Sequence, residues 1–217
     1  MGWNRTAVAP GATEVADYQT DLFAAGTPGL SHDAAVERRV LDDRSWLDVS
    51  SRWLNGADEL LVELASRLRW TAAQRPMYGQ MVDEPRLGAQ MTCPAAAAPA
   101  VVNAMAAALS ERYGEGLNSL WVNYYRDGCD SVAWHSDRIG IDPADSLVAI
   151  VSLGGPRRFL LRPKGGGRSR LFTLASGDLL VMGGACQQSW EHSVPKSAAA
   201  PPRMSLTFRR TRQARRR

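Results

Sequence analysis

Two histidines and an aspartate have the residue types and the spacing of a ligand set for a redox-active metal ion. His135 and Asp137 stand two positions apart, and His192 follows later in the chain. Two imidazoles and one carboxylate form the facial triad that binds Fe(II) and leaves coordination positions open. The chain has three histidines in all, and two of them belong to this pattern. Such a triad would make the protein an oxygen-activating enzyme.

The spacing of His135 and Asp137 suits convergence on one ion. Both fall in a segment with the pattern of a strand, where residues two apart share a face and lie ~7 Å apart along the backbone. Trp134 must then point to the opposite face, where we expect it to pack beneath helices. His192 would come from another strand, after an expected loop at residues 185–191. Because His-x-Asp is a short motif, a surface pair with an unrelated His192 is the alternative.

The bulk composition is that of a globular chain with an uneven positive charge. At 217 residues, 45% of them hydrophobic, the chain can bury a substantial core. Three widely spaced cysteines favour a reducing compartment, and hence a cytoplasmic location, over a disulfide framework. No apolar run has the length of a membrane span, and we expect no membrane attachment. The formal net charge is +4, with arginines gathered at the C-terminus that would attract phosphate groups.

The chain divides into a helix-containing first part and a strand-rich second part. We interpret residues 1–30 as a flexible arm, 31–114 as a helical and lid extension, 115–212 as the core, and 213–217 as an arginine-rich tail. Apolar residues at helical spacing predict helices that begin near residues 55–58 and that run from about 99 to 113. Seven or eight short strands then predict a sandwich or barrel. The expected class is α+β, a double-stranded β-helix (jelly roll) with helices and a hairpin lid packed on it.

A set of motifs in fixed order surrounds the triad. These are Asn-x-Tyr-x-x-Gly at Asn123, His-x-Asp, a distal histidine, and two arginines six positions apart. The segments NSLWVNYYRDGCDSVAWHSD, GDLLVMGGACQQSWEHSVP and RMSLTFR resemble the AlkB family of Fe(II)/2-oxoglutarate dioxygenases. The resemblance covers roughly residues 117–211 and reaches weakly back to EPRL at 84–87. It implies Fe(II), 2-oxoglutarate and O₂, and the demethylation of N-alkylated bases with release of formaldehyde, succinate and CO₂.

The resemblance also implies a role for each matching residue. The positions that match the iron ligands are His135, Asp137 and His192. The positions that match the 2-oxoglutarate site are Asn123, Tyr125, Arg203, Ser205, Thr207 and Arg209, although the family usually has asparagine at the place of Ser205. Six residues along a strand would put the two arginines on one face, ~20 Å apart at the backbone. Their planar guanidinium groups could then reach opposite ends of a short diacid.

Residues for the substrate depart most from the family pattern. After His-x-Asp the family places acidic residues that read the base, and after Pro-Arg-Leu it places aromatic lid residues; neither is present here. We expect substrate contacts from Arg86, Gln90, Met91, Arg138 and Arg162. The basic residues between 157 and 170 surround a glycine-rich hairpin and could clamp phosphates, and an exposed basic loop is the alternative.

Three functions remain open at this point. The first is a monomeric demethylase of N-alkylated bases in DNA or RNA. The second, favoured by the missing base-reading residues, is a 2-oxoglutarate-dependent hydroxylase of a protein or small molecule. The third, favoured by the basic tail, is a nucleic-acid-binding module without catalysis. The full set of matching iron and co-substrate positions favours the first.

Overall fold

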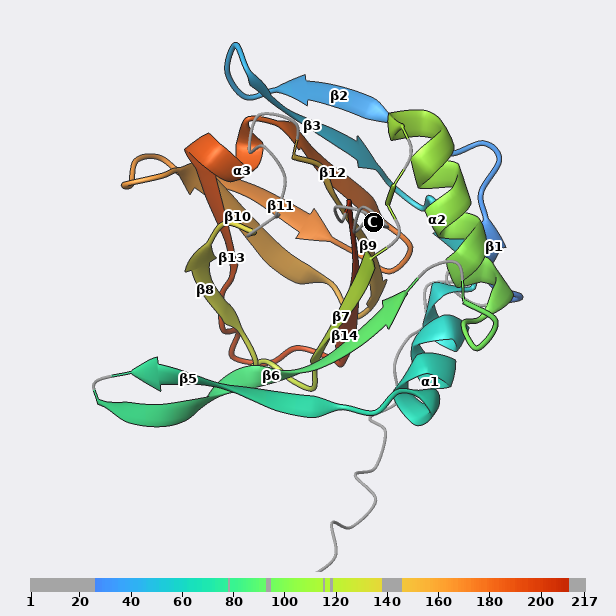
Figure 1. Cartoon of the computed structure of the whole chain (residues 1–217), viewed down its shortest axis with the longest axis horizontal. Helices are drawn as coiled ribbons and strands as arrows, with labels where there is room; N and C mark the ends of the chain where they lie inside the picture. Colours follow the sequence, from blue (N-terminus) through green and yellow to red (C-terminus); the bar gives the residue numbers. More distant parts are fainter. Residues whose placement is uncertain are drawn as a thin grey trace, which may run out of the picture.

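Two antiparallel β-sheets packed face to face form the body of the molecule (Figure 1). The computed structural model describes residues 26–77, 79–92, 95–114, 116–117, 119–137 and 146–210. The large sheet contains, in spatial order, β2 (Glu37–Val40), β3 (Ser45–Ser50), β12 (Leu179–Gly184), β9 (Val148–Gly154), β14 (Arg203–Arg209), β7 (Ser119–Tyr125), β6 (Gln80–Thr92) and β5 (Thr71–Met77). The small sheet contains β11 (Arg170–Leu174), β10 (Arg157–Pro163), β13 (Trp190–Val194) and β8 (Val132–His135). A separate short pair joins β1 (Gly29–Leu30) to β4 (Leu54–Asn55).

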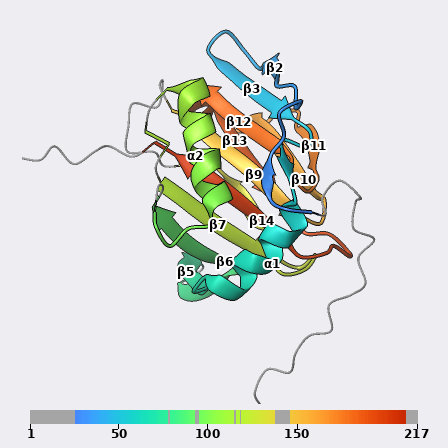
Figure 2. The same ribbon diagram turned by 90° about the vertical axis from the view of Figure 1, so that its right-hand side faces the viewer.

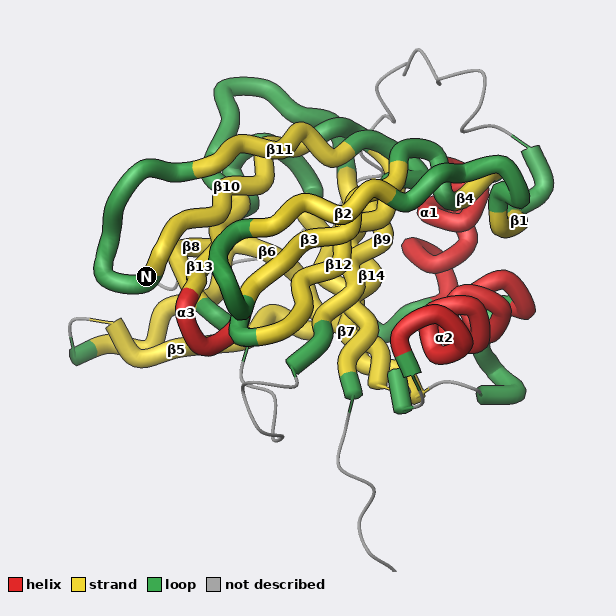
Figure 3. The backbone as a smooth tube through the Cα atoms, turned by 90° about the horizontal axis from the view of Figure 1, so that it is seen from above, coloured by secondary structure: helices red, strands yellow, loops and turns green. Residues whose placement is uncertain are grey.

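Two helices cover the outer face of the large sheet (Figures 2 and 3). They are α1 (Ala57–Arg67) and α2 (Ala100–Tyr113), while a single turn, α3 (Cys186–Ser189), links β12 to β13. Leu60 and Leu64 of α1 and Met105 of α2 are fully buried in the same cluster as Leu206 of β14. Burial of this apolar stripe, at ~25 cal/mol per Å2 of surface, holds the helices against the sheet.

A second apolar cluster fills part of the space between the two sheets. Leu47, Val148 and Leu180 of the large sheet meet Phe159 and Leu161 of the small one. Strand β14 separates the two interiors, because alternate residues of a strand point to opposite faces. Its members Met204, Leu206 and Phe208 belong to the helix-facing cluster, whereas its other residues line a pocket on the inner face.

The expected jelly roll with packed helices is confirmed: α1 begins close to the expected position, and α2 begins and ends close to its expected positions. The large sheet extends beyond the expected core of residues 115–212, because β2, β3, β5 and β6, which precede residue 115, all join it. The expected loop at 185–191 is wrong: α3 and the start of β13 occupy it, so His192 lies within a strand.

Residues 1–25 of the expected N-terminal arm (1–30) and the arginine-rich tail at 213–217 lie outside the described residues, whereas residues 29 and 30 form β1 and pair with β4. Within the described residues, no helix combines the length and the apolar character that a membrane crossing requires.

Candidate active site

A pocket of about 450 Å3 lies between the two sheets and collects most of the residues singled out from the sequence. Strand β14 supplies every second residue to it, and β7 pairs with β14 in a register that sets Tyr125 opposite Arg203 and Asn123 opposite Ser205. The other side is closed by the small sheet, which carries His135 and His192, and by Asp137, which follows β8. Residues predicted from sequence that line this pocket are Arg86, Asn123, Tyr125, His135, Asp137, His192, Arg203, Ser205, Thr207 and Arg209.

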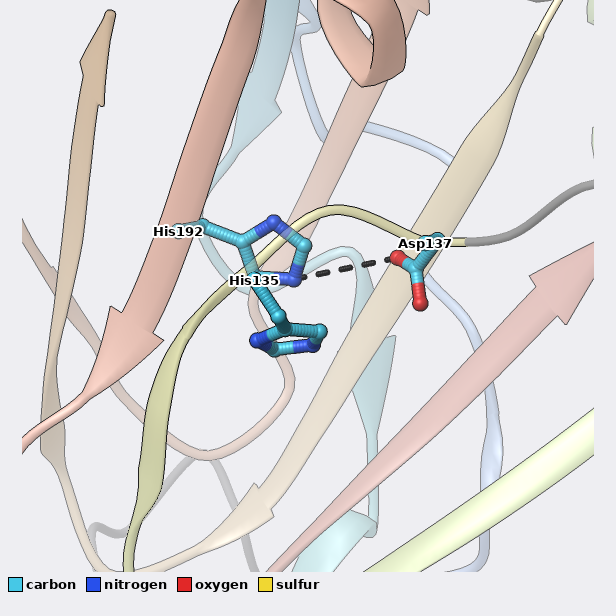
Figure 4. Close-up of side chains that lie close together, drawn as sticks. All are labelled: His135, Asp137 and His192. Carbon is cyan, nitrogen blue, oxygen red and sulfur yellow. Dashed lines mark ion pairs between the residues drawn. The ribbon is translucent and has the colours of Figure 1, made fainter. Parts of the chain in front are cut away.

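The structure brings His135, Asp137 and His192 together (Figure 4). Each offers a ligand atom, and these atoms all lie within 4.8 Å of one another. The two histidines are direct cross-strand neighbours in β8 and β13, with ring centroids 4.2 Å apart. Asp137 follows β8 in a loop, and its Oδ2 lies 3.7 Å from Nε2 of His192. Two imidazoles and a carboxylate at this separation fit the donor set of a single Fe(II) ion.

Both imidazoles have surroundings that suit a metal ligand. Nδ1 of His135 lies 2.9 Å from the carbonyl oxygen of Ala133. A carbonyl only accepts, so Nδ1 carries a proton and Nε2 is the nitrogen that faces a metal ion. Burial lowers the pKa of His192 to about 3, against the opposing effect of the Asp137 carboxylate. His192 therefore stays unprotonated at neutral pH, as metal binding requires.

Asp137 is held by two contacts from outside the triad. Its backbone N–H donates to Oε1 of Gln187 at 2.8 Å, and Nη2 of Arg209 contacts its Oδ1. The expectation that Asp137 lies on the same strand as His135 is wrong, because β8 ends at His135. The carboxylate nevertheless reaches the ion site, because Gln187, 5% exposed in α3, fixes the loop that carries it.

Replacement of Gln187 with leucine is expected to weaken iron binding and turnover by about 10- to 100-fold, the range typical of partners that orient metal ligands. The variant removes the acceptor for the Asp137 N–H and frees the loop to move. Anaerobic Fe(II) titration and succinate formation measure the two effects. The neighbouring Gln188 is exposed and provides the matched control, Gln188→Leu. Equal iron affinity in the two variants would contradict the positioning role.

Arg203 is a buried cation with unused hydrogen-bond donors. Its side chain is 1% exposed, and Nη2 donates to Oγ of Ser152 at 2.8 Å. Nε and Nη1 have no hydrogen-bond partner among the described residues. Burial lowers the pKa of Arg203, yet arginine stays charged at neutral pH. A buried guanidinium with two free donors is costly in isolation and suits a carboxylate that arrives with the co-substrate.

The side-chain amide of Asn123 is oriented by two donors. Its Oδ1 accepts from Nε1 of Trp121 at 2.9 Å and from Nε of Arg86 at 3.1 Å. Its Nδ2 therefore points toward Ser205, 3.4 Å from Oγ. Gly88 of β6 allows this arrangement, because a Cβ there would lie 2.7 Å from the Trp121 ring. The pocket thus presents an N–H donor from Asn123 next to the cation of Arg203.

The expected substrate contacts are only partly brought to the pocket. Gln90 and Met91 line a different hollow beside α1 and α2, so their expected role at the pocket is corrected. Arg162 lies on the outer face of the small sheet, where its Nε is 2.6 Å from Glu191 and its Cζ is 3.9 Å from the Trp134 ring. Trp134 therefore does not pack beneath the helices as expected. Arg138 lies outside the described residues.

Sequence reasoning missed several residues that shape the pocket. Trp121 could have been found, because it stands two residues before Asn123 on the same strand face. Ser152 and Ile150 share the inner face of β9 opposite Ser205 and Thr207, which only the strand order reveals. No sequence pattern marked Gln187.

The basic residues expected to cluster around the hairpin are dispersed. Arg157 is buried and donates to the carbonyl oxygens of Asp127, Asp130 and Pro195. Arg170 donates to the carbonyl oxygens of Val40 and Leu41.

A family model described as the 2OG-Fe(II) oxygenase superfamily matches residues 63–209, a range that contains the triad and the pocket residues Arg203 and Arg209. The chain belongs to the 2OG-Fe(II) oxygenase superfamily. Its members use iron and 2-oxoglutarate with O₂, and the His-Asp-His cluster fits the iron. The triad supplies a ligand set for the iron, and the unpaired N–H groups of Arg203 suit a carboxylate of 2-oxoglutarate.

Curated relatives of this oxygenase confirm the resemblance to the AlkB family. The chain is 38% identical over 111 residues to the alpha-ketoglutarate-dependent dioxygenase alkB homolog 3 of Mus musculus, with 46% of this chain and 39% of that protein covered. It is also 38% identical over 120 residues to the DNA oxidative demethylase ALKBH2 of Arabidopsis thaliana, with 44% and 38% covered. The chain therefore spans about 39% of the length of such relatives.

Solved structures agree on the fold. The structure described as OsALKBH1 superposes with a TM-score of 0.57 at 15% identity, covering 80% of this chain and 100% of that one. A prolyl-4-hydroxylase from Pseudomonas putida superposes with a TM-score of 0.54 at 17% identity, covering 77% and 93%. At these identities the likeness concerns the arrangement of the strands alone.

Proposed function

We propose that this oxygenase demethylates N-alkylated bases in DNA or RNA, with Fe(II), 2-oxoglutarate and O₂. The proposal rests on one observation: the His-Asp-His cluster and Arg203 line the same pocket. Arg203 is buried there, and its Nε and Nη1 have no hydrogen-bond partner among the described residues. The names of the curated relatives, a dioxygenase of the alkB type and a DNA oxidative demethylase, support the substrate class. The formal charge of +4 suits a polyanionic substrate.

In this proposal the triad binds the metal. His135 and His192 supply neutral imidazoles, and Asp137 supplies the single anionic ligand. Bound iron and 2-oxoglutarate would together activate O₂ for oxidation of the methyl group, yielding succinate, CO₂ and, after loss of the hydroxymethyl group, formaldehyde. Phe159 stacks beside His192 with centroids 5.2 Å apart and limits the access of water to that side of the site.

The inner face of β14 and β7 binds the co-substrate in this proposal. Arg203 holds one carboxylate through its free Nε and Nη1, and the Tyr125 ring lies 5.3 Å below the guanidinium. Asn123 and Ser205 supply further hydrogen-bond donors, and Thr207 continues the same face. Arg209 is the second arginine of the pair; its contact with Asp137 places it at the iron end of the pocket.

The proposal is tested by formaldehyde release from oligonucleotides that contain 1-methyladenine, compared with unmodified oligonucleotides. Release that requires the methyl group, iron and 2-oxoglutarate is expected. A non-catalytic module would release no formaldehyde and form no succinate. A hydroxylase of a protein or small molecule would ignore the lesion, and succinate formation would be the same with either oligonucleotide.

We also propose that the enzyme is cytoplasmic and monomeric. The two described cysteines, Cys129 and Cys186, are free thiols, which is typical of proteins from reducing compartments. Burial raises the pKa of Cys186 to about 12, so this thiol stays protonated and unreactive. Elution as a single chain in size-exclusion chromatography would support the monomer.

A further inference from the structure

A second hollow, of about 220 Å3, opens between β6, β8 and β13, next to the active-site pocket. We call it the outer hollow. Arg86, Val132 and Val194 line both the outer hollow and the pocket that contains the triad. The register between β13 and β8 shifts between His192 and Val194, an irregularity of the kind that redirects side chains beside active sites. The two spaces are therefore neighbours with shared walls.

The outer hollow has an aromatic wall. Trp134 lines it and is held in place from the outer face of the small sheet. Cζ of Arg162 lies 3.9 Å from the centroid of the Trp134 ring, and Arg162 is itself fixed by Glu191 at 2.6 Å. A ring held in this way loses little freedom when a planar group packs against it. Tryptophan in a charged surface groove is a platform on which nucleobases stack.

The outer hollow also carries unneutralised positive charge. Lys196 is exposed at its rim and has no ion-pair partner among the described residues. Arg86 is paired with Glu84 at 2.8 Å, and among the residues that the structure describes no acidic side chain lines the hollow. A ligand with a flat apolar part and an anionic part matches these walls. A nucleotide has both.

We propose that the outer hollow binds the nucleotide adjacent to the reacting base on the same strand, with its base or sugar against Trp134 and its phosphate at Lys196. This inference rests on the proposed function, because a strand whose methylated base occupies the pocket must pass over the walls that the two spaces share. Cations at the rim would position the strand without reading its sequence. The identity of the base in the outer hollow should therefore have little effect on binding.

The test uses the iron- and 2-oxoglutarate-loaded enzyme and a fluorescent single-stranded pentanucleotide with a central 1-methyladenine. Trp134→Ala and Lys196→Ala are each expected to raise the Kd for the pentanucleotide roughly tenfold, the scale of one lost stacking or phosphate contact. Lys196→Ala should also reduce the salt dependence of log Kd by about 0.7, one phosphate on a single strand. The succinate formed without nucleic acid should stay unchanged, because neither residue lines the active-site pocket.

Matched variants separate this effect from loss of structure and of function. Arg69→Ala removes an exposed cation beside a different hollow and should leave the Kd unchanged. Lys196 is exposed in the segment that follows β13, so Lys196→Glu tests the charge even if Trp134→Ala fails to fold. Wild-type affinity for the pentanucleotide in Lys196→Glu would overturn the outer-hollow site while formaldehyde release by the wild type continues. Absence of formaldehyde release by the wild type would instead reject the proposed function.

Discussion

Asp137→Ala is expected to reduce succinate formation to the level measured without enzyme. Among the described residues, Asp137 is the only anionic member of the cluster, so no second carboxylate is placed to bind the ion instead. Its side chain is 5% exposed. Its loss also leaves Arg209 without the contact that it makes at the iron end of the pocket. Succinate formation and anaerobic Fe(II) binding measure the two consequences.

The third histidine of the chain supplies the control for this experiment. His32 is exposed and lies outside the pocket, so His32→Ala should retain wild-type turnover, whereas His135→Ala should behave like Asp137→Ala. Turnover that survives in both Asp137→Ala and His135→Ala would reject the metal site.

Arg203→Met is expected to raise the KM for 2-oxoglutarate by at least about 100-fold, since loss of one partner from a buried ion pair costs roughly 3–5 kcal/mol. In the absence of 2-oxoglutarate the same variant should be as stable as the wild type or more stable, because it removes a buried charge with two unpaired donors. 2-Oxoglutarate should therefore raise the Tm of the wild type and not that of the variant.

Arg158→Met is the matched control for Arg203→Met. Arg158 lies on β10, is exposed, and does not line the pocket. Its replacement should leave both the KM for 2-oxoglutarate and the ligand-induced rise in Tm unchanged. A normal 2-oxoglutarate response in Arg203→Met would contradict the assignment of the carboxylate site.

The sequence predicted the parts of the site that follow strand periodicity. The alternation of Arg203, Ser205, Thr207 and Arg209 along β14 placed these residues on one face, as the structure confirms. Asn123 and Tyr125 follow the same rule on β7. The two helices were predicted because their apolar faces recur at helical spacing and pack on the sheet.

Contacts between distant segments could not be predicted in this way. The hydrogen bond from Asp137 to Gln187 and that from Arg203 to Ser152 depend on strand order, which periodicity does not specify. Met91 lies opposite Leu120 in the β6–β7 register and packs against the helix-facing cluster, whereas Gln90 lies opposite Trp121. Adjacent residues of a strand point to opposite faces, so the sequence motif alone could not assign residues 90 and 91 to one face.

The most direct test of the site is anaerobic titration of Fe(II) into the chain with 2-oxoglutarate present, followed through the visible charge-transfer absorption of the iron–2-oxoglutarate complex. One Fe(II) per chain is predicted, with absorption that reaches its full value in wild type and Arg158→Met. The absorption should be lost in His192→Ala. Full absorption in His192→Ala, or none in the wild type, would contradict the assignment of His135, Asp137 and His192 as the iron site.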